Sequence, residues 1–143
     1  MATTLILLKP DCITKGLCGE VIKRFEAAGF SLRGIKMLQM SDALVHEHYA
    51  HIADKPFFPE VVAFMQSSPI VALALDGDNV VDAVRDLLGP TDSTKAAPGT
   101  IRGDHGVDVM VNVAHASDSA DSAAAELARF FKPEELFNPA PRA

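Results

Sequence analysis

The chain has 143 residues and a formal net charge of −6, and 48% of its residues are hydrophobic while 22% are charged. This length suits a single domain over residues 1–143, and no apolar run reaches the roughly 18 residues that a membrane-spanning helix needs. The negative charge disfavours binding to nucleic acid or anionic membranes, which depends on clustered Lys and Arg. Because the N-terminal residues also lack the basic start and long apolar stretch of a secretion signal, we expect a cytoplasmic protein.

The N-terminal half of the chain predicts strands that alternate with helices. Residues 3–8 are β-branched and leucine-rich and predict a strand, and residues 19–28 predict an amphipathic helix followed by a glycine. Residues 31–40 alternate imperfectly and favour a second strand. A serine N-cap predicts a short helix over residues 41–48, and a first-turn proline favours another over residues 59–66.

The C-terminal half continues this alternation. Residues 70–75 form a continuous apolar run typical of a buried strand, and after a turn residues 79–88 predict a helix that ends at a Gly-Pro pair. Residues 91–106 predict a long loop, which in a compact domain is often functional. We expect the last strand within residues 106–114 and a final helix over residues 120–131.

Two cysteines, Cys12 and Cys18, are too few and too close together for a disulfide scaffold. Free thiols in a reducing compartment fit this spacing better. A redox-active pair that closes a six-residue loop is the alternative.

The familiar glycine-rich phosphate-binding patterns are absent from the chain. Neither GxxxxGK[ST] nor GxGxxG occurs, so side chains must bind any phosphate. The cations that stand near glycines or turns are Lys9, Arg85 and Arg102. We therefore consider these three side chains as candidate phosphate ligands.

His115 stands at the end of a predicted strand, where a side chain can face substrate while the sheet fixes its position. A neutral imidazole has a free lone pair, and the ordinary pKa of histidine, about 6.5, leaves that form populated at neutral pH. It can attack phosphorus without a separate base. On position alone, a packing or capping histidine is the competing interpretation.

Three other histidines lie close together in the sequence. His46, His48 and His51 have spacings that place them on different sides of a helix, and no zinc-ligand pattern accompanies them. We therefore expect a solvated helix surface here and no metal site.

Six segments resemble the nucleoside diphosphate kinase family. The most specific is Asn112–Ser119, which resembles the family signature Asn-x-x-His-[Gly/Ala]-Ser-Asp-Ser. The other segments, which also follow the family order, are Lys9–Asp11, Arg24–Glu26, Lys55–Phe58, Leu88–Thr91 and Pro98–Asp104. The resemblance runs from residue 5 to about residue 136, and so many motifs in register favour a catalytic role for His115.

The resemblance implies that His115 is the nucleophile of a ping-pong phosphotransferase. A nucleoside triphosphate would load the histidine, its diphosphate would leave, and a second diphosphate would collect the phosphate from the same pocket. The family suggests that the Nδ1 atom takes the phosphate.

The resemblance also implies which residues bind the nucleotide. Lys9, Arg85, Thr91 and Arg102 match phosphate-contacting positions, with Mg²⁺ carried by the nucleotide phosphates. Asn112 and Lys9 match positions that meet the sugar hydroxyls. Phosphoryl transfer depends mainly on such alignment and charge stabilisation.

The base-binding and supporting residues are implied in the same way. Phe57 matches the aromatic residue that stacks on the base, and Val61, one turn later, would close the opposite side. Stacking reads no hydrogen-bond pattern, so low base selectivity is expected. Tyr49, Ser117 and Glu126 match positions near the histidine, and the last two would orient its ring.

The chain departs from the family pattern at three positions. Val61 stands where the family often has Leu, Ala116 replaces the commoner Gly, and His105 occupies a position that is often aromatic. None of these departures removes a catalytic group.

The implied fold is a ferredoxin-like α/β (α+β) sandwich, a four-stranded antiparallel sheet with helices packed on one face. The implied partners are nucleoside di- and triphosphates and further copies of the chain. Because the chain stops soon after Asn138, a dimer or tetramer is expected rather than a hexamer.

Two alternatives from other functional classes remain at this stage. The same fold hosts many functions, so a non-catalytic nucleotide-binding or regulatory module is one alternative. A structural subunit is the other. The complete set of Lys9, Arg85, Arg102, Asn112 and His115 argues against both, since a binding module has little need of the histidine.

Overall fold

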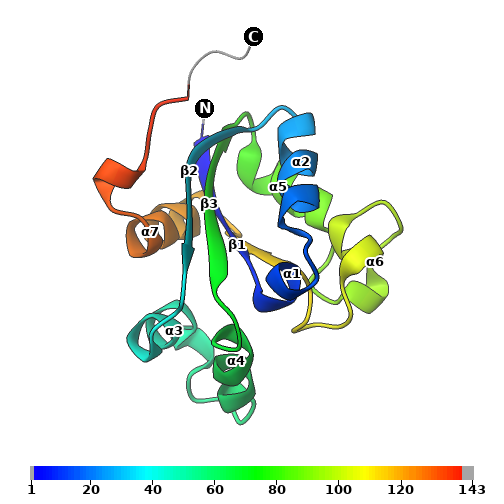
Figure 1. Ribbon diagram of the computed structural model, residues 1–143, viewed down its shortest axis with the longest axis vertical. Coiled ribbons are helices and arrows are strands. Elements are labelled where there is room, and N and C mark those ends of the chain that lie inside the picture. The colour runs from blue at the N-terminus through cyan, green and yellow to red at the C-terminus, as the bar shows by residue number, and fades with distance from the viewer. Residues whose placement is uncertain (1, 140–143) are drawn as a thin grey trace.

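The computed structural model describes residues 2–139 and contains one four-stranded sheet (Figure 1). Its strands are β1 (Ala2–Leu8), β2 (Ser31–Leu38), β3 (Ile70–Gly77) and β4 (Ala114–Ala116). They lie in the order β2-β3-β1-β4, and every neighbouring pair is antiparallel. This arrangement confirms the expected antiparallel four-stranded sheet.

Most of the expected helices are present within a few residues of their predicted bounds. The helices are α1 (Pro10–Thr14), α2 (Cys18–Ala27), α3 (Asp42–His48), α4 (Phe58–Met65), α5 (Val80–Leu88), α6 (Ile101–His105) and α7 (Ala120–Phe130). Three short 3₁₀ helices are η1 (Ala50–Ile52), η2 (Ser93–Lys95) and η3 (Pro133–Glu135). No helix within residues 2–139 is long and apolar enough to cross a bilayer.

The helix caps follow the sequence. The Ser41 hydroxyl accepts from the backbone N–H of Leu44 at 3.1 Å, and the Ser119 hydroxyl accepts from that of Ser122 at 3.0 Å. Each bond satisfies one of the N–H groups that a helix start leaves without a partner. The sequence therefore fixes where α3 and α7 begin.

Both faces of the sheet are buried, which corrects the expectation that helices pack on one face only. Ile6 and Leu8 of β1 pack with α2 and α5, whereas Leu5 and Leu7 pack with α3, α4 and α7. Figure 1 shows α2 and α5 on one side of the sheet and α3 and α7 on the other. Successive side chains of a strand point to opposite faces, so the continuous apolar run of β1 requires cover on both.

The segment predicted as a long loop over residues 91–106 contains η2 and α6. The Thr100 hydroxyl caps α6 by accepting from the N–H of Gly103 at 3.0 Å. A Cβ at Gly103 would lie 2.0 Å from the Ala97 carbonyl oxygen, so only glycine fits there. α6 was missed because five residues are too few to show a helical period.

The last strand spans 114–116, so the prediction of a strand within 106–114 was wrong. The Asp108 carboxylate accepts from the N–H groups of Met110 and Val111, and the N–H of Val107 donates to the Val111 carbonyl. These bonds curl the segment into a turn. Apolar alternation alone did not reveal that an aspartate would satisfy this backbone locally.

The pairing of β1 with the edge strand β4 positions the site described next. Leu7 lies opposite His115, and the N–H of Lys9 donates to the Val113 carbonyl at 2.9 Å. The residues that follow β1 therefore lie beside those that precede β4. α1, a five-residue helix that the sequence reading missed, turns the chain away immediately after Lys9.

Candidate active site

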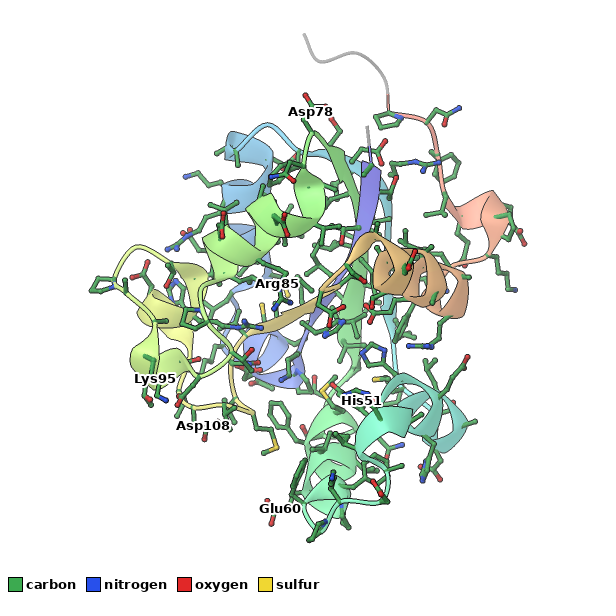
Figure 2. The ribbon with its side chains drawn as sticks, turned by 180° about the vertical axis from the view of Figure 1, so that it is seen from behind. His51, Glu60, Asp78, Arg85, Lys95 and Asp108 are labelled. Atoms are coloured by element: carbon green, nitrogen blue, oxygen red, sulfur yellow. The ribbon has the colours of Figure 1, made fainter. Side chains whose placement is uncertain are left out.

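A cleft of about 1060 Å³ opens beside the end of β4. Ten of the eleven candidate site residues line it, and these are Lys9, Tyr49, Phe57, Val61, Arg85, Thr91, Arg102, Asn112, His115 and Glu126. Figure 2 shows that three other lining positions, His51, Glu60 and Asp108, come from separate segments around it. The fold thus brings together residues that are more than 100 positions apart in the sequence, such as Lys9 and His115.

His115 is held by a carboxylate on α7. Its Nε2 atom lies 2.8 Å from Oε1 of Glu126, and its side chain is 27% exposed. The Ser117 hydroxyl donates to the same Oε1 at 2.7 Å. Ser117 is buried behind the cleft, so it reaches His115 only through Glu126.

The charge of Glu126 determines which histidine nitrogen is free. Burial raises the pKa of this carboxyl, but the hydrogen bond and positive charge of His115, the Ser117 hydroxyl and the charge of His48 outweigh burial and hold the pKa at about 2. An ionised carboxylate only accepts, so Nε2 of His115 must donate to it. The lone pair of the neutral ring then lies on Nδ1.

Lys9 is a buried cation on the floor of the cleft. Its Nζ donates to the Met110 carbonyl at 2.6 Å and to Oδ1 of Asn112 at 2.8 Å. Burial lowers its pKa to about 8, with Asp11 opposing and the positive charge of Arg102 adding to the effect. Lys9 is therefore charged at neutral pH and sensitive to any anion that enters the cleft.

The two candidate arginines are held differently. Arg102 is buried, and its guanidinium donates to the carbonyls of Gly89, Asn112 and Ala114. Burial and the neighbouring charge of Arg85 lower its pKa to about 10. Arg85 is exposed on α5, and its one hydrogen bond within residues 2–139 is a 3.3 Å bond to the Ala116 carbonyl. Both guanidiniums keep unused N–H groups for an anion.

Asn112 fixes the loop between α6 and β4. Its amide nitrogen donates to the carbonyls of Thr91 and Val109 at 3.0 and 3.1 Å, while its oxygen accepts from Lys9. Both of its N–H groups are thus used inside the protein. Only the second lone pair of Oδ1 remains for a ligand hydroxyl.

Part of the outer wall of the cleft is apolar. Phe57 is 49% exposed, whereas its neighbour Phe58 is buried in the core. Val61 follows Phe57 by one helical turn and also lines the cleft. Val109, 60% exposed, lines the cleft from a different segment and was missed.

The backbone beside His115 is strained. Val113 has φ of +75°, a conformation that β-branched residues rarely adopt and that costs about 1–3 kcal/mol. Its N–H donates to Oδ2 of Asp11 at 2.9 Å, and its carbonyl accepts from the N–H of Lys9. Asp11 is therefore a supporting residue that the sequence reading quoted in a motif but assigned no role.

His48 corrects the expectation of a solvated histidine cluster. His46 and His51 are exposed, but His48 is buried and its ring packs edge-on against that of His115 at 4.7 Å between centroids. Its position next to Tyr49, a residue already expected near His115, was the available signal. No group of three metal-binding side chains occurs within residues 2–139.

Tyr49 lines the cleft beside this pair of histidines. Its ring packs edge-on against His48 at 4.8 Å. Burial, with a further contribution from the negative charge of Glu126, raises its pKa well above the ordinary value. Tyr49 therefore stays a neutral phenol.

Comparison with known proteins identifies close relatives over almost the whole chain. A family model described as nucleoside diphosphate kinase matches residues 2–136. The nucleoside diphosphate kinase of Carboxydothermus hydrogenoformans is 48% identical over 138 residues, covering 96% of this chain and 93% of that protein. That of Pelotomaculum thermopropionicum is 47% identical over 136 residues, covering 95% and 91%.

Solved structures agree with these relatives. A halophilic nucleoside diphosphate kinase from Halobacterium salinarum, solved in complex with CDP, superposes with a TM-score of 0.94 at 40% identity and covers 97% of this chain and 93% of its own. The Aquifex aeolicus nucleoside diphosphate kinase superposes with a TM-score of 0.90 at 40% identity, covering 94% and 98%.

Proposed function

This chain belongs to the nucleoside diphosphate kinase family, and we propose that its phosphoryl transfer runs through a phosphohistidine at His115. It is a nucleotide-binding transferase of nucleotide metabolism that moves phosphate between nucleoside tri- and diphosphates. A non-catalytic binding module is not favoured. The observation that carries the proposal is the Nε2 contact of His115 with ionised Glu126, which leaves the Nδ1 lone pair for a substrate in a cleft that three cations also line.

In the first half-reaction, Nδ1 of His115 attacks the terminal phosphorus of a nucleoside triphosphate. The N–P bond forms as the bond to the bridging oxygen breaks, and the nucleoside diphosphate leaves. A second diphosphate then attacks the phosphohistidine by the reverse path. Glu126 stabilises the positive charge that develops on the imidazole when Nδ1 becomes bonded to phosphorus.

Lys9, Arg85 and Arg102 stabilise the negative charge of the transferring phosphoryl group. Thr91 lines the same cleft. Phosphoryl transfer needs little covalent help from the protein beyond such placement. Asn112 offers its remaining Oδ1 lone pair to a sugar hydroxyl, close to Lys9. The shared lining of the cleft and the match to the family motifs support these proposed roles.

Kinases of this family generally use a divalent metal ion, and we propose Mg²⁺. The cations of the cleft suit phosphate rather than metal, so the ion would enter on the phosphate oxygens of the nucleotide. It supplies further positive charge to those oxygens when bound. The phosphate groups of the nucleotide would therefore determine where the ion binds.

The apolar wall suits a base without selecting its identity. The exposed ring of Phe57 offers a stacking surface, Val61 extends the same wall, and Val109 offers contact from another segment. Every base has a π-face, so we propose that adenine and guanine nucleotides and their deoxy forms all serve.

Three broader assignments accompany this function. Residues 1–143 form one domain of this family. The protein acts in the cytoplasm, where nucleotide pools are held. It assembles as a homo-oligomer, for which a dimer or tetramer is the proposed size.

The decisive experiment is incubation with terminally labelled ATP followed by denaturation. Acid-labile, base-stable label that GDP removes from the wild type, and that His115→Ala never acquires, supports the proposal. Stable labelling of His115→Ala, or no labelling of a folded wild type, contradicts it.

A further inference from the structure

Building on the proposed phosphohistidine, we propose that His48 is a positioning residue for His115 and that Arg129 locks His48 in a single tautomer for this task. Neither residue was expected at the site from the sequence. The pair comes from α3 and α7 and lines the cleft together with His115.

Arg129 determines where the proton of His48 resides. Its Nη1 lies 2.9 Å from Nδ1 of His48. A guanidinium only donates, so Nδ1 must accept and the ring proton must sit on Nε2. An imidazolium has no lone pair to offer, so protonation of His48 would break this bond.

The ring of His48 is enclosed and in turn supports His115. His48 is 6% exposed and packs edge-on against His115 at 4.7 Å, Tyr49 at 4.8 Å and Phe130 at 5.2 Å between centroids. The hydrogen bond to Glu126 fixes one atom of the His115 ring, which leaves rotation about that point. A rigid ring edge against His115 restricts this rotation and keeps Nδ1 directed at the incoming phosphorus.

The charges around His48 favour its neutral form. Burial and the positive charge of His115 on β4 lower its pKa, Glu126 on α7 opposes, and Arg129 on α7 and His51 on η1 lower it further, to about 3. A charged His48 would compete with His115 for Glu126. The neutral form leaves that carboxylate to the nucleophile.

α7 supplies the side chains that contact the two histidines. Glu126 and Arg129 are three residues apart, so they lie on the same face of the helix. Glu126 contacts His115 and Arg129 contacts His48. Arg129 is itself oriented by Glu47, whose carboxylate lies 3.5 Å from its Nε. One helix face therefore holds both rings in the Nε2–H tautomer, because Glu126 accepts from Nε2–H of His115 and Arg129 donates to Nδ1 of His48.

The test uses Arg129→Met, which removes the donor, and Arg129→Lys, which keeps charge and a donor. Arg33→Met is the matched control. Arg33 lies on β2, outside the cleft, and donates to the Phe137 carbonyl. Two quantities are measured for each protein, the ¹⁵N shifts of the His48 ring and the single-turnover rate of His115 phosphorylation from pH 5.5 to 8.5 at saturating ATP.

Wild type should show His48 protonated at Nε2 alone across this range. In Arg129→Met both nitrogens should show averaged shifts, because the neutral ring loses the donor that fixes its tautomer. Burial, the largest cause of the lowered pKa of His48, remains in this variant, so the ring should stay neutral over this range. Phosphorylation should slow about fivefold at pH 7.5, with ATP KM changed less than about twofold. Arg129→Lys should recover most of the rate.

His48→Asn separates the ring from the hydrogen bond, because its amide oxygen can still accept from Arg129. It should slow phosphorylation at least as much as Arg129→Met. Unchanged His48 shifts in Arg129→Met overturn the proposal, as does an unchanged rate or a rate loss that is matched by Arg33→Met. If wild-type His115 takes no phosphate, the proposed function fails, while the ¹⁵N shifts still decide the Arg129–His48 contact.

Discussion

The two walls of the cleft are built on opposite principles. The inner wall, made of residues at the ends of β1 and β4 and of Arg102, is buried and internally hydrogen-bonded through Lys9, Asn112 and three backbone carbonyls. The outer wall presents exposed side chains such as Phe57, Arg85 and Val109, for which few bonds to the protein are found within residues 2–139. The difference teaches that this chain preorganises most of the groups that we propose for phosphate, with Arg85 as the exception. It leaves the surface that we propose for the base adaptable.

The comparison is tested most severely by removing one arginine from each wall. Arg102→Met and Arg85→Met should each lower kcat by about 10²- to 10³-fold, because each removes a phosphate donor. Only Arg102→Met should also unfold more easily, by about 2 kcal/mol or more, since it leaves three carbonyls without their donor. Steady-state kinetics and denaturant unfolding measure the two effects. Equal losses of stability would remove the distinction between the walls.

Replacing the carboxylate behind the nucleophile should have a smaller effect. Glu126→Gln keeps an acceptor for His115 but loses the negative charge, and charge-assisted bonds are about twice as strong as neutral ones. We expect kcat to fall about tenfold while ATP KM stays within about twofold. Single-turnover phosphorylation measures this. A fall in affinity with unchanged kcat would indicate that Glu126 serves binding instead.

A change in the outer wall should affect binding and spare chemistry. Phe57→Ala should raise KM about tenfold through lost stacking, equally for ATP and GTP, with kcat nearly unchanged. The neighbour provides the control, because Phe58→Ala should instead lower stability by about 3 kcal/mol as a core residue. A selective loss for one base would contradict the idea of an adaptable wall.

The smallest expected effect comes from the titration of Lys9. With its pKa lowered to about 8, kcat/KM should fall as pH rises through 8, and bound phosphate should move the corresponding limb of kcat to higher pH. Stability should change in the opposite direction. The unfolded lysine keeps its proton to a pKa of 10.5, so between these values the unfolded state binds more protons and stability rises with pH. Lys9→Met should remove both dependences, and a kcat/KM that stays flat to pH 9.5 would show that Lys9 has another role.

The sequence predicted local features well and tertiary ones poorly. Serine caps and apolar periods located α3, α7 and the first three strands, and quoted motifs located His115 and its cations. The position of the last strand was predicted wrongly because the Asp108 side chain accepts from the backbone N–H groups of Met110 and Val111, which then form no strand. His48 escaped for a different reason. Its helix face becomes buried only when α7 brings Phe130 and Arg129 against it, which spacing within α3 cannot show.

The measurement that tests the central claim most directly is the site of phosphorylation within the His115 ring. Protein with ¹⁵N-labelled histidine is phosphorylated by ATP and examined under base-stable conditions by ³¹P–¹⁵N coupling. The account predicts one phosphorus bonded to Nδ1, with Nε2 still protonated against Glu126. Phosphorus on Nε2, or on any residue other than His115, would contradict it.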